Sequence, residues 1–117
     1  MQESDRMKTR LRTDLVAAIK HGRKVEATIL RELIAALDNA EAPPVRREQL
    51  SLVQHDFLSG SAETEKLLLS REQVREVLQA EIETREQAAA EYARLGKGAD
   101  SLLAEVTVAR RYLDNVQ

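Results

Sequence analysis

Side chains that could carry out chemistry are few in this chain of 117 residues. It contains no cysteine, and its two histidines, His21 and His55, lie far apart, without the HxxxH or ExxH spacing of a metal site. No phosphate-binding loop, dinucleotide fingerprint or nucleophile elbow is present. We therefore expect no catalytic residue, no metal and no cofactor in the isolated chain.

A cluster of basic residues is the first candidate binding site. Such clusters can bind phosphate groups, but stacking on nucleic-acid bases needs aromatic side chains, and the chain has one Phe and two Tyr. Both a phosphate-binding patch and a solvent-exposed turn are compatible with this composition. The cluster consists of Lys20, His21, Arg23 and Lys24, and a second, smaller basic group consists of Arg46 and Arg47.

The second candidate is an acid and a base on a helix face that should be apolar. Steps of four and three residues from Val74 place Glu81 and Arg85 on that face, four residues apart with the acid first, as in a helical ion pair. A buried pair would need further partners, because an uncompensated buried charge costs several kcal/mol. We predict a polar network that also contains Arg31 and Glu105. The alternative is that this face widens toward solvent at Glu81 and Arg85.

Four helices are expected to position these side chains. The first should cover about residues 4–21 and stop at Gly22, and the second should cover about residues 24–41 and stop before the Pro43–Pro44 pair. Their expected apolar positions are Met7, Leu11, Leu15, Ala18 and Ile19, then Ile29, Leu30, Leu33, Ile34 and Leu37.

The third helix should begin after a capping box made by Ser70 and Gln73, run for about 25 residues and end at Gly96 and Gly98. We expect Asp100 or Ser101 to cap the fourth helix. Their expected apolar positions are Val74, Val77, Leu78, Ile82, Ala88, Ala89, Tyr92 and Leu95, then Leu102, Leu103, Val106, Ala109 and Leu113.

A long connection, residues 43–70, separates the second helix from the third. It is longer than an ordinary loop, and a short helix over about residues 46–57 is possible within it. The stretch SGSAE indicates a flexible tip. The sequence thus predicts an all-α fold, a single bundle of four main helices in one domain over residues 1–117.

Composition limits the class of protein further. Apolar residues make up 43% of the chain and charged residues 32%, and no run approaches the roughly 20 apolar residues of a membrane span. The absence of cysteine and of a signal-like N-terminus favours the cytoplasm. The net charge is −2, so any attraction to nucleic acid must come from a local patch.

Two long segments resemble the helical N-terminal domain of the GatB/YqeY family: LRTDLVAAIKHGRKVEATILRELIAALDNAEAPP and LSREQVREVLQAEIETREQAAAEYARLGKGADSLLAEVTVARRYL. Together they cover about three-quarters of the chain. The family pattern is matched by Arg10, Leu11, Asp14, Leu15, Ala18 and Lys20, by Arg31, Asn39, Ala40 and Glu41, by Glu81, Arg85, Ala89 and Tyr92, and by Gly96 and Glu105.

This resemblance implies an accessory, non-catalytic role in tRNA-dependent amide transfer, because the family is similar to part of the amidotransferase B subunit. Carbon–nitrogen ligase activity with glutamine as amido donor attaches to it by family association only. Full-length members continue through a Pro into a small second helical domain, whereas Asp114 occupies that position here. We therefore expect the second domain to be absent. The partner implied is a tRNA or another protein, and the alternative function is a protein-interaction bundle without a tRNA link.

Overall fold

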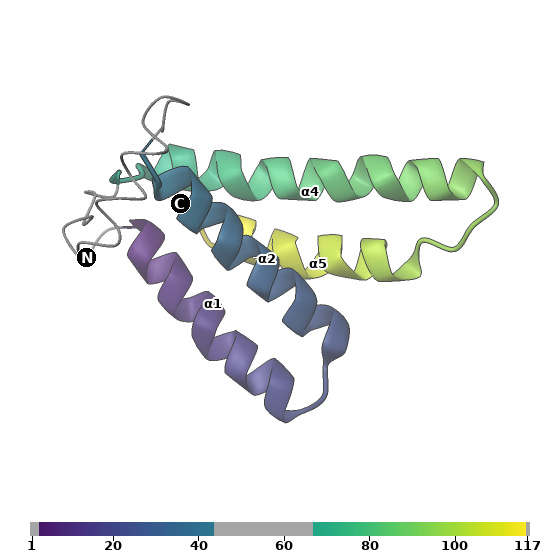
Figure 1. Ribbon diagram of the computed structural model, residues 1–117, viewed down its shortest axis with the longest axis horizontal. Coiled ribbons are helices and arrows are strands. Elements are labelled where there is room, and N and C mark those ends of the chain that lie inside the picture. Colours follow the sequence, from purple (N-terminus) through teal and green to yellow (C-terminus); the bar gives the residue numbers. More distant parts are fainter. Residues whose placement is uncertain (1–2, 44–66, 117) are drawn as a thin grey trace, which may run out of the picture.

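The computed structural model describes residues 3–43 and 67–116, which form four helices and, within these ranges, no strand (Figure 1). The predicted all-α bundle is therefore confirmed. The possible helix over residues 46–57, the SGSAE stretch and most of the predicted long connection lie outside the described residues. The helices are α1 (Glu3–Lys20), α2 (Lys24–Glu41), α4 (Arg71–Arg94) and α5 (Asp100–Asp114).

The four helices form two antiparallel hairpins, α1–α2 and α4–α5 (Figure 1). The hairpins meet at one end of the molecule, where α1 and α4 begin and α2 and α5 end, and they diverge toward their turns. Helix α2 packs on both α4 and α5, and α1 also contacts α4. Two separated tips result, one at the α1–α2 turn and one at the α4–α5 turn.

Local sequence signals account for most helix boundaries. Both turns use a glycine with positive φ, Gly22 at +70° and Gly96 at +73°, a conformation that side chains disfavour. The predicted capping box at Ser70 is present, with the Gln73 amide donating to Ser70 Oγ at 3.1 Å and the Ser70 amide donating to Gln73 Oε1 at 2.8 Å. Helix α2 has the predicted limits, and α1 begins and ends one residue early.

The predicted cap of the fourth helix was wrong. Ala99 occupies the N-cap position, and no side chain caps this helix. Asp100 is instead its first residue, where a carboxylate is favoured by the helix dipole without bonding to a backbone amide.

Buried side chains from all four helices form one hydrophobic core. Helices α2 and α5 contribute five core residues each, and α1 and α4 contribute three each. The core consists of Met7, Leu11, Ala18, Ala27, Ile29, Leu30, Leu33, Leu37, Leu69, Val74, Leu78, Ile82, Val106, Val108, Ala109, Tyr112, Leu113 and Val116.

Some predicted core positions near the tips are exposed. Ile19, at the end of α1, and Tyr92 and Leu95, at the end of α4, are 54%, 44% and 57% exposed, and Leu103 in α5 is 51% exposed. All four lie near the turns, where the hairpins have diverged (Figure 1). The apolar spacing of the helices therefore continues into their ends near the turns, where no other hairpin is close enough to bury the side chains.

A polar group, the Lys8 cluster, joins the start of α1 to the end of α2, and all of its members except Asp38 are buried. It consists of Ser4, Lys8, Asp38 and Glu41. Lys8 Nζ donates to Asp38 Oδ1 at 3.0 Å and to Glu41 Oε1, and Ser4 Oγ donates to Glu41 Oε2 at 2.6 Å. Burial alone would lower the pKa of Lys8, but the hydrogen bonds to Glu41 and Asp38 outweigh it and raise the pKa. The lysine is therefore held in its charged form.

Tyr112 links α5 to α1 from inside the core. Its hydroxyl donates to Asp14 Oδ2 at 2.5 Å, and the Arg10 guanidinium lies 5.3 Å from the centre of its ring. Burial and the hydrogen bond to Asp14 raise the pKa of the tyrosine. The hydroxyl accordingly remains a donor at every ordinary pH.

We expect Lys8→Met to lower the free energy of unfolding by about 2–4 kcal/mol at pH 7, because it removes a buried cation that bonds to the Glu41 and Asp38 carboxylates. Since the pKa of Lys8 is raised on folding, its contribution is complete below the ordinary lysine value of 10.5 and is lost as the pH rises through the higher folded value. Urea unfolding at several pH values measures both effects.

The matched control is Arg12→Met, at an exposed position of the same helix, with an expected loss below about 1 kcal/mol. Equal losses for the two variants at pH 7 would contradict a stabilising role for the Lys8 cluster.

Candidate functional site

Arg85 lies near the middle of α4 and bonds to carboxylates from three helices. Its Nε donates to Glu105 Oε1 on α5 at 2.9 Å, and its Nη1 donates to Glu81 Oε1 on α4 at 3.1 Å and to the Glu81 carbonyl at 2.8 Å. Its Nη2 donates to Glu32 Oε2 on α2. We call Arg85 and these three glutamates the Arg85 cluster. Every nitrogen of the guanidinium is engaged, which fixes its orientation.

Three of the four predicted network residues meet in this cluster: Glu81, Arg85 and Glu105. The fourth, Arg31, does not. It is exposed and makes no hydrogen bond or ion pair within the part of the chain that the structure describes, and Glu32 supplies the contact from α2 instead.

The sequence does contain a signal that Glu32 faces the other helices. Glu32 lies three residues after Ile29, so the two share a side of α2, and Ile29 is fully buried. Arg31 is turned about 100° away from Glu32 around the helix. A second cation would also be repelled by Arg85, whereas a carboxylate is attracted to it.

The cluster combines three carboxylates with one guanidinium, so it is rich in negative charge. The exposed fraction of the side chain is 9% for Arg85, 14% for Glu105, 30% for Glu81 and 46% for Glu32. Burial raises the pKa of the Glu81 carboxyl. Among the described residues, no group of three His, Cys, Asp or Glu side chains could hold a metal ion. The arginine occupies the position between the carboxylates, and the arrangement suits structural cross-linking.

The predicted basic cluster lies at the α1–α2 turn, and we call it the basic tip: Lys20, His21, Arg23 and Lys24. All four residues are exposed. Arg23 Nε donates to Glu26 Oε2 at 3.0 Å, while the other three side chains make no hydrogen bond or ion pair to the described residues. Arg46 and Arg47 lie outside the residues that the structure describes.

Two further features make the basic tip strongly positive. Helix α2 begins there without a side-chain cap, so its first backbone amides and its dipole add to the positive potential. In addition, residues 10–31 contain six Lys and Arg and only two acidic residues, a net charge of +4 in a chain whose total is −2. The four cations at the turn were predicted from the sequence, whereas this wider separation of charge was not.

A shallow hollow of about 500 Å³ adjoins the basic tip, between the start of α2 and the side of α5. Arg23, Lys24 and Arg111 line it, with Glu26 as its acidic residue. Arg111 Nη1 lies 3.6 Å from Glu26 Oε1. Cations therefore outnumber acids in this hollow, as an anion-binding surface requires.

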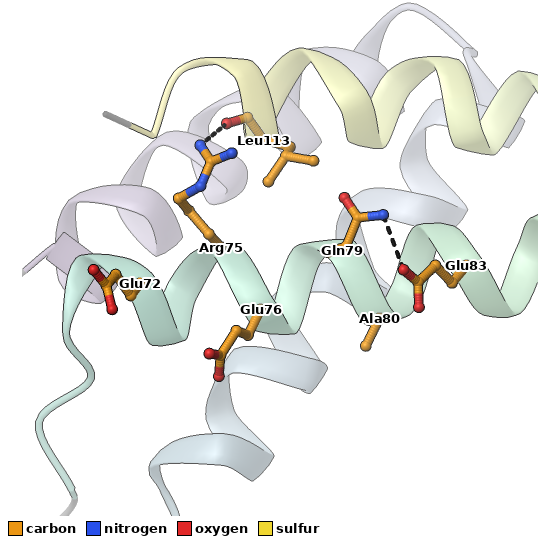
Figure 2. A pocket seen from close by; sticks show the side chains of 7 residues that line it. All are labelled: Glu72, Arg75, Glu76, Gln79, Ala80, Glu83 and Leu113. Carbon is orange, nitrogen blue, oxygen red and sulfur yellow. Dashed lines mark hydrogen bonds between the residues drawn. The ribbon is translucent and has the colours of Figure 1, made fainter.

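A second hollow, of about 440 Å³, lies along α4 beside the end of α5 (Figure 2). Figure 2 shows Arg75 extending toward α5, where its Nη1 donates to the carbonyl oxygens of Leu113 at 3.3 Å and Val116 at 2.6 Å. The surrounding charge is acidic, from Glu72, Glu76 and Glu83. The two hollows thus have opposite electrostatic character.

Comparison with known proteins yields no relative: no protein-family model matches the chain, and neither a curated protein nor a solved structure matches it significantly. Within residues 3–43 and 67–116, none of the helices combines the length and apolar character of a membrane span. Functional inference therefore depends on the two charged surfaces and the sequence pattern.

We expect Arg85→Ala to lower the free energy of unfolding by about 2–4 kcal/mol, because the loss of the guanidinium leaves Glu105 and Glu81 poorly solvated and without a cation. Urea unfolding at pH 7 measures the loss. A loss below about 1 kcal/mol would show that the cluster behaves as ordinary surface charge.

Two conservative variants resolve the roles of the carboxylates. Because burial raises the pKa of Glu81, its charge lowers stability as the pH rises above the ordinary glutamate value, so Glu81→Gln should cost less at pH 7 than Glu105→Gln. In the Arg85→Ala background the loss caused by Glu105→Gln should shrink, because Glu105 acts through the arginine, whereas the effect of burial on Glu81 should remain.

Proposed function

We propose that this chain is a non-catalytic helical domain of the GatB/YqeY type that serves as an accessory in tRNA-dependent amide transfer. In this proposal the basic tip contacts the phosphate backbone of the RNA. The observation that carries it is the concentration of positive charge in residues 10–31, net +4, in an otherwise acidic chain. The spaced family-like residues in all four helices support the same assignment.

The side chains of the basic tip suit contact with a phosphate backbone better than contact with bases. Lys20, His21 and Lys24 are exposed and carry no ion pair within the described residues, so binding need not break an internal contact. Tyr92, the exposed aromatic residue among those described, belongs to the opposite hairpin, so base stacking is not available at the basic tip. Recognition there should be electrostatic and largely independent of base sequence.

A plain protein-interaction bundle is the second candidate function. It is favoured by exposed aliphatic side chains, since Val16 is 66% and Ile19 54% exposed on α1. Phosphate binding does not account for these two residues.

We expect the chain to bind total tRNA at low salt, with an affinity that falls roughly a hundredfold between about 50 and 200 mM salt if about four phosphates are contacted. Fluorescence anisotropy across a salt series gives the slope. Replacing Lys20 and Lys24 together by Gln should reduce that slope by about two units.

The control is Lys97→Gln, at an exposed position of the other turn, which should leave the salt slope unchanged. Absence of binding at low salt, or an equal effect of the control, would refute RNA contact by the basic tip.

A further inference from the structure

The outer side of α1 carries two exposed aliphatic residues among cations. Arg12, Val16 and Ile19 follow one another at steps of four and three residues, so they lie on one side of the helix. Ile19 and Arg31 line a hollow of about 410 Å³ between α1 and α2, whose lining contains no carboxylate. Arg12 and Arg31 are both exposed, with no ion pair to the described residues. We call Arg12, Val16, Ile19 and Arg31 the α1 ridge.

The α4 hollow in Figure 2 has the complementary character. Ala80 and the buried Leu113 give it apolar surface, and three carboxylates, those of Glu72, Glu76 and Glu83, lie along it. Glu72 and Glu83 are eleven residues apart, which is about 16 Å along a helix.

We propose that the α1 ridge of one protomer docks onto the α4 hollow of a second copy of this chain. Val16 and Ile19 then cover Ala80 and Leu113, while Arg12 and Arg31 face Glu76 and Glu83. Charge complementarity favours this occupant, because the ridge is cationic and the hollow acidic.

Two other candidate binding partners account for fewer features of the α1 ridge. A nucleic acid would contact the cations but leave Val16 and Ile19 in water. At the α4–α5 tip, another exposed apolar patch, the cations Arg94 and Lys97 balance Glu91 and Asp100, so the tip has no net negative charge to attract the ridge. Arg12 and Arg31 lie outside the basic tip, so charge reversal at the ridge can be tested separately from the Lys20 and Lys24 substitutions at the tip.

The docked surfaces differ from each other, so the contact is heterologous and each protomer offers one of each kind. Sedimentation velocity over a protein concentration series should show reversible association that weakens as salt is raised. Replacing Arg12 and Arg31 by Glu places like charges opposite one another, and so does replacing Glu76 and Glu83 by Arg. Each double variant should weaken association at least about tenfold.

Rescue provides the decisive measurement. Mixing the two double variants pairs opposite charges at both kinds of contact, and combining all four substitutions in one chain does the same, so each should restore association. All four positions are exposed, so the variants should keep the helical circular dichroism of the parent.

Three outcomes would overturn the inference. The first is a parent protein that stays monomeric at every concentration at low salt. The second is association that ignores the charge reversals, and the third is association that only Leu95→Ser at the α4–α5 tip abolishes. RNA binding that is lost in the ridge variant of a strictly monomeric chain would assign the ridge to nucleic acid instead.

Discussion

Arg85 is the point at which the two hairpins are held together by charge. Its side chain is nearly buried, and each of its three nitrogens donates a hydrogen bond to a carboxylate or carbonyl oxygen of the protein. Because Glu32 and Glu105 come from α2 and α5, the bonds fix how far along α4 each of those helices can slide. Apolar packing alone tolerates such sliding, whereas a fork of directional hydrogen bonds does not.

The Lys8 cluster provides a second fixed point, at the end where the hairpins meet. It ties the start of α1 to the end of α2 through hydrogen bonds among buried groups, and Tyr112 ties α5 to α1 nearby. Both hairpins are therefore anchored at one end and in the middle, and neither is covered at its turn. This explains why the turns carry the exposed aliphatic and basic side chains on which the functional proposals depend.

The fold was predictable because its signals are local. Glycines mark both turns, the Ser70 and Gln73 capping box marks the start of α4, and the apolar spacing marks the buried sides. The partners in the Arg85 cluster were harder to predict, because the choice between Arg31 and Glu32 depends on how α2 is rotated against α4. Lys8 and Glu41 were missed for a similar reason: each looks like a surface residue until the hairpin brings it beside the other. Periodicity also failed for Tyr92, Leu95 and Leu103, because it contains no information about where neighbouring hairpins diverge.

Charge is used in two distinct ways along this chain. In the Lys8 and Arg85 clusters, a buried cation bonds to several carboxylates, and these contacts specify geometry. On the surface the charges are separated, with positive charge on α1 and the start of α2 and carboxylates along α4. Separation of this kind leaves like charges close together, and their repulsion lowers the free energy of unfolding. A partner that neutralises one of these surfaces removes that repulsion, so the cost to the free chain becomes a driving force for binding.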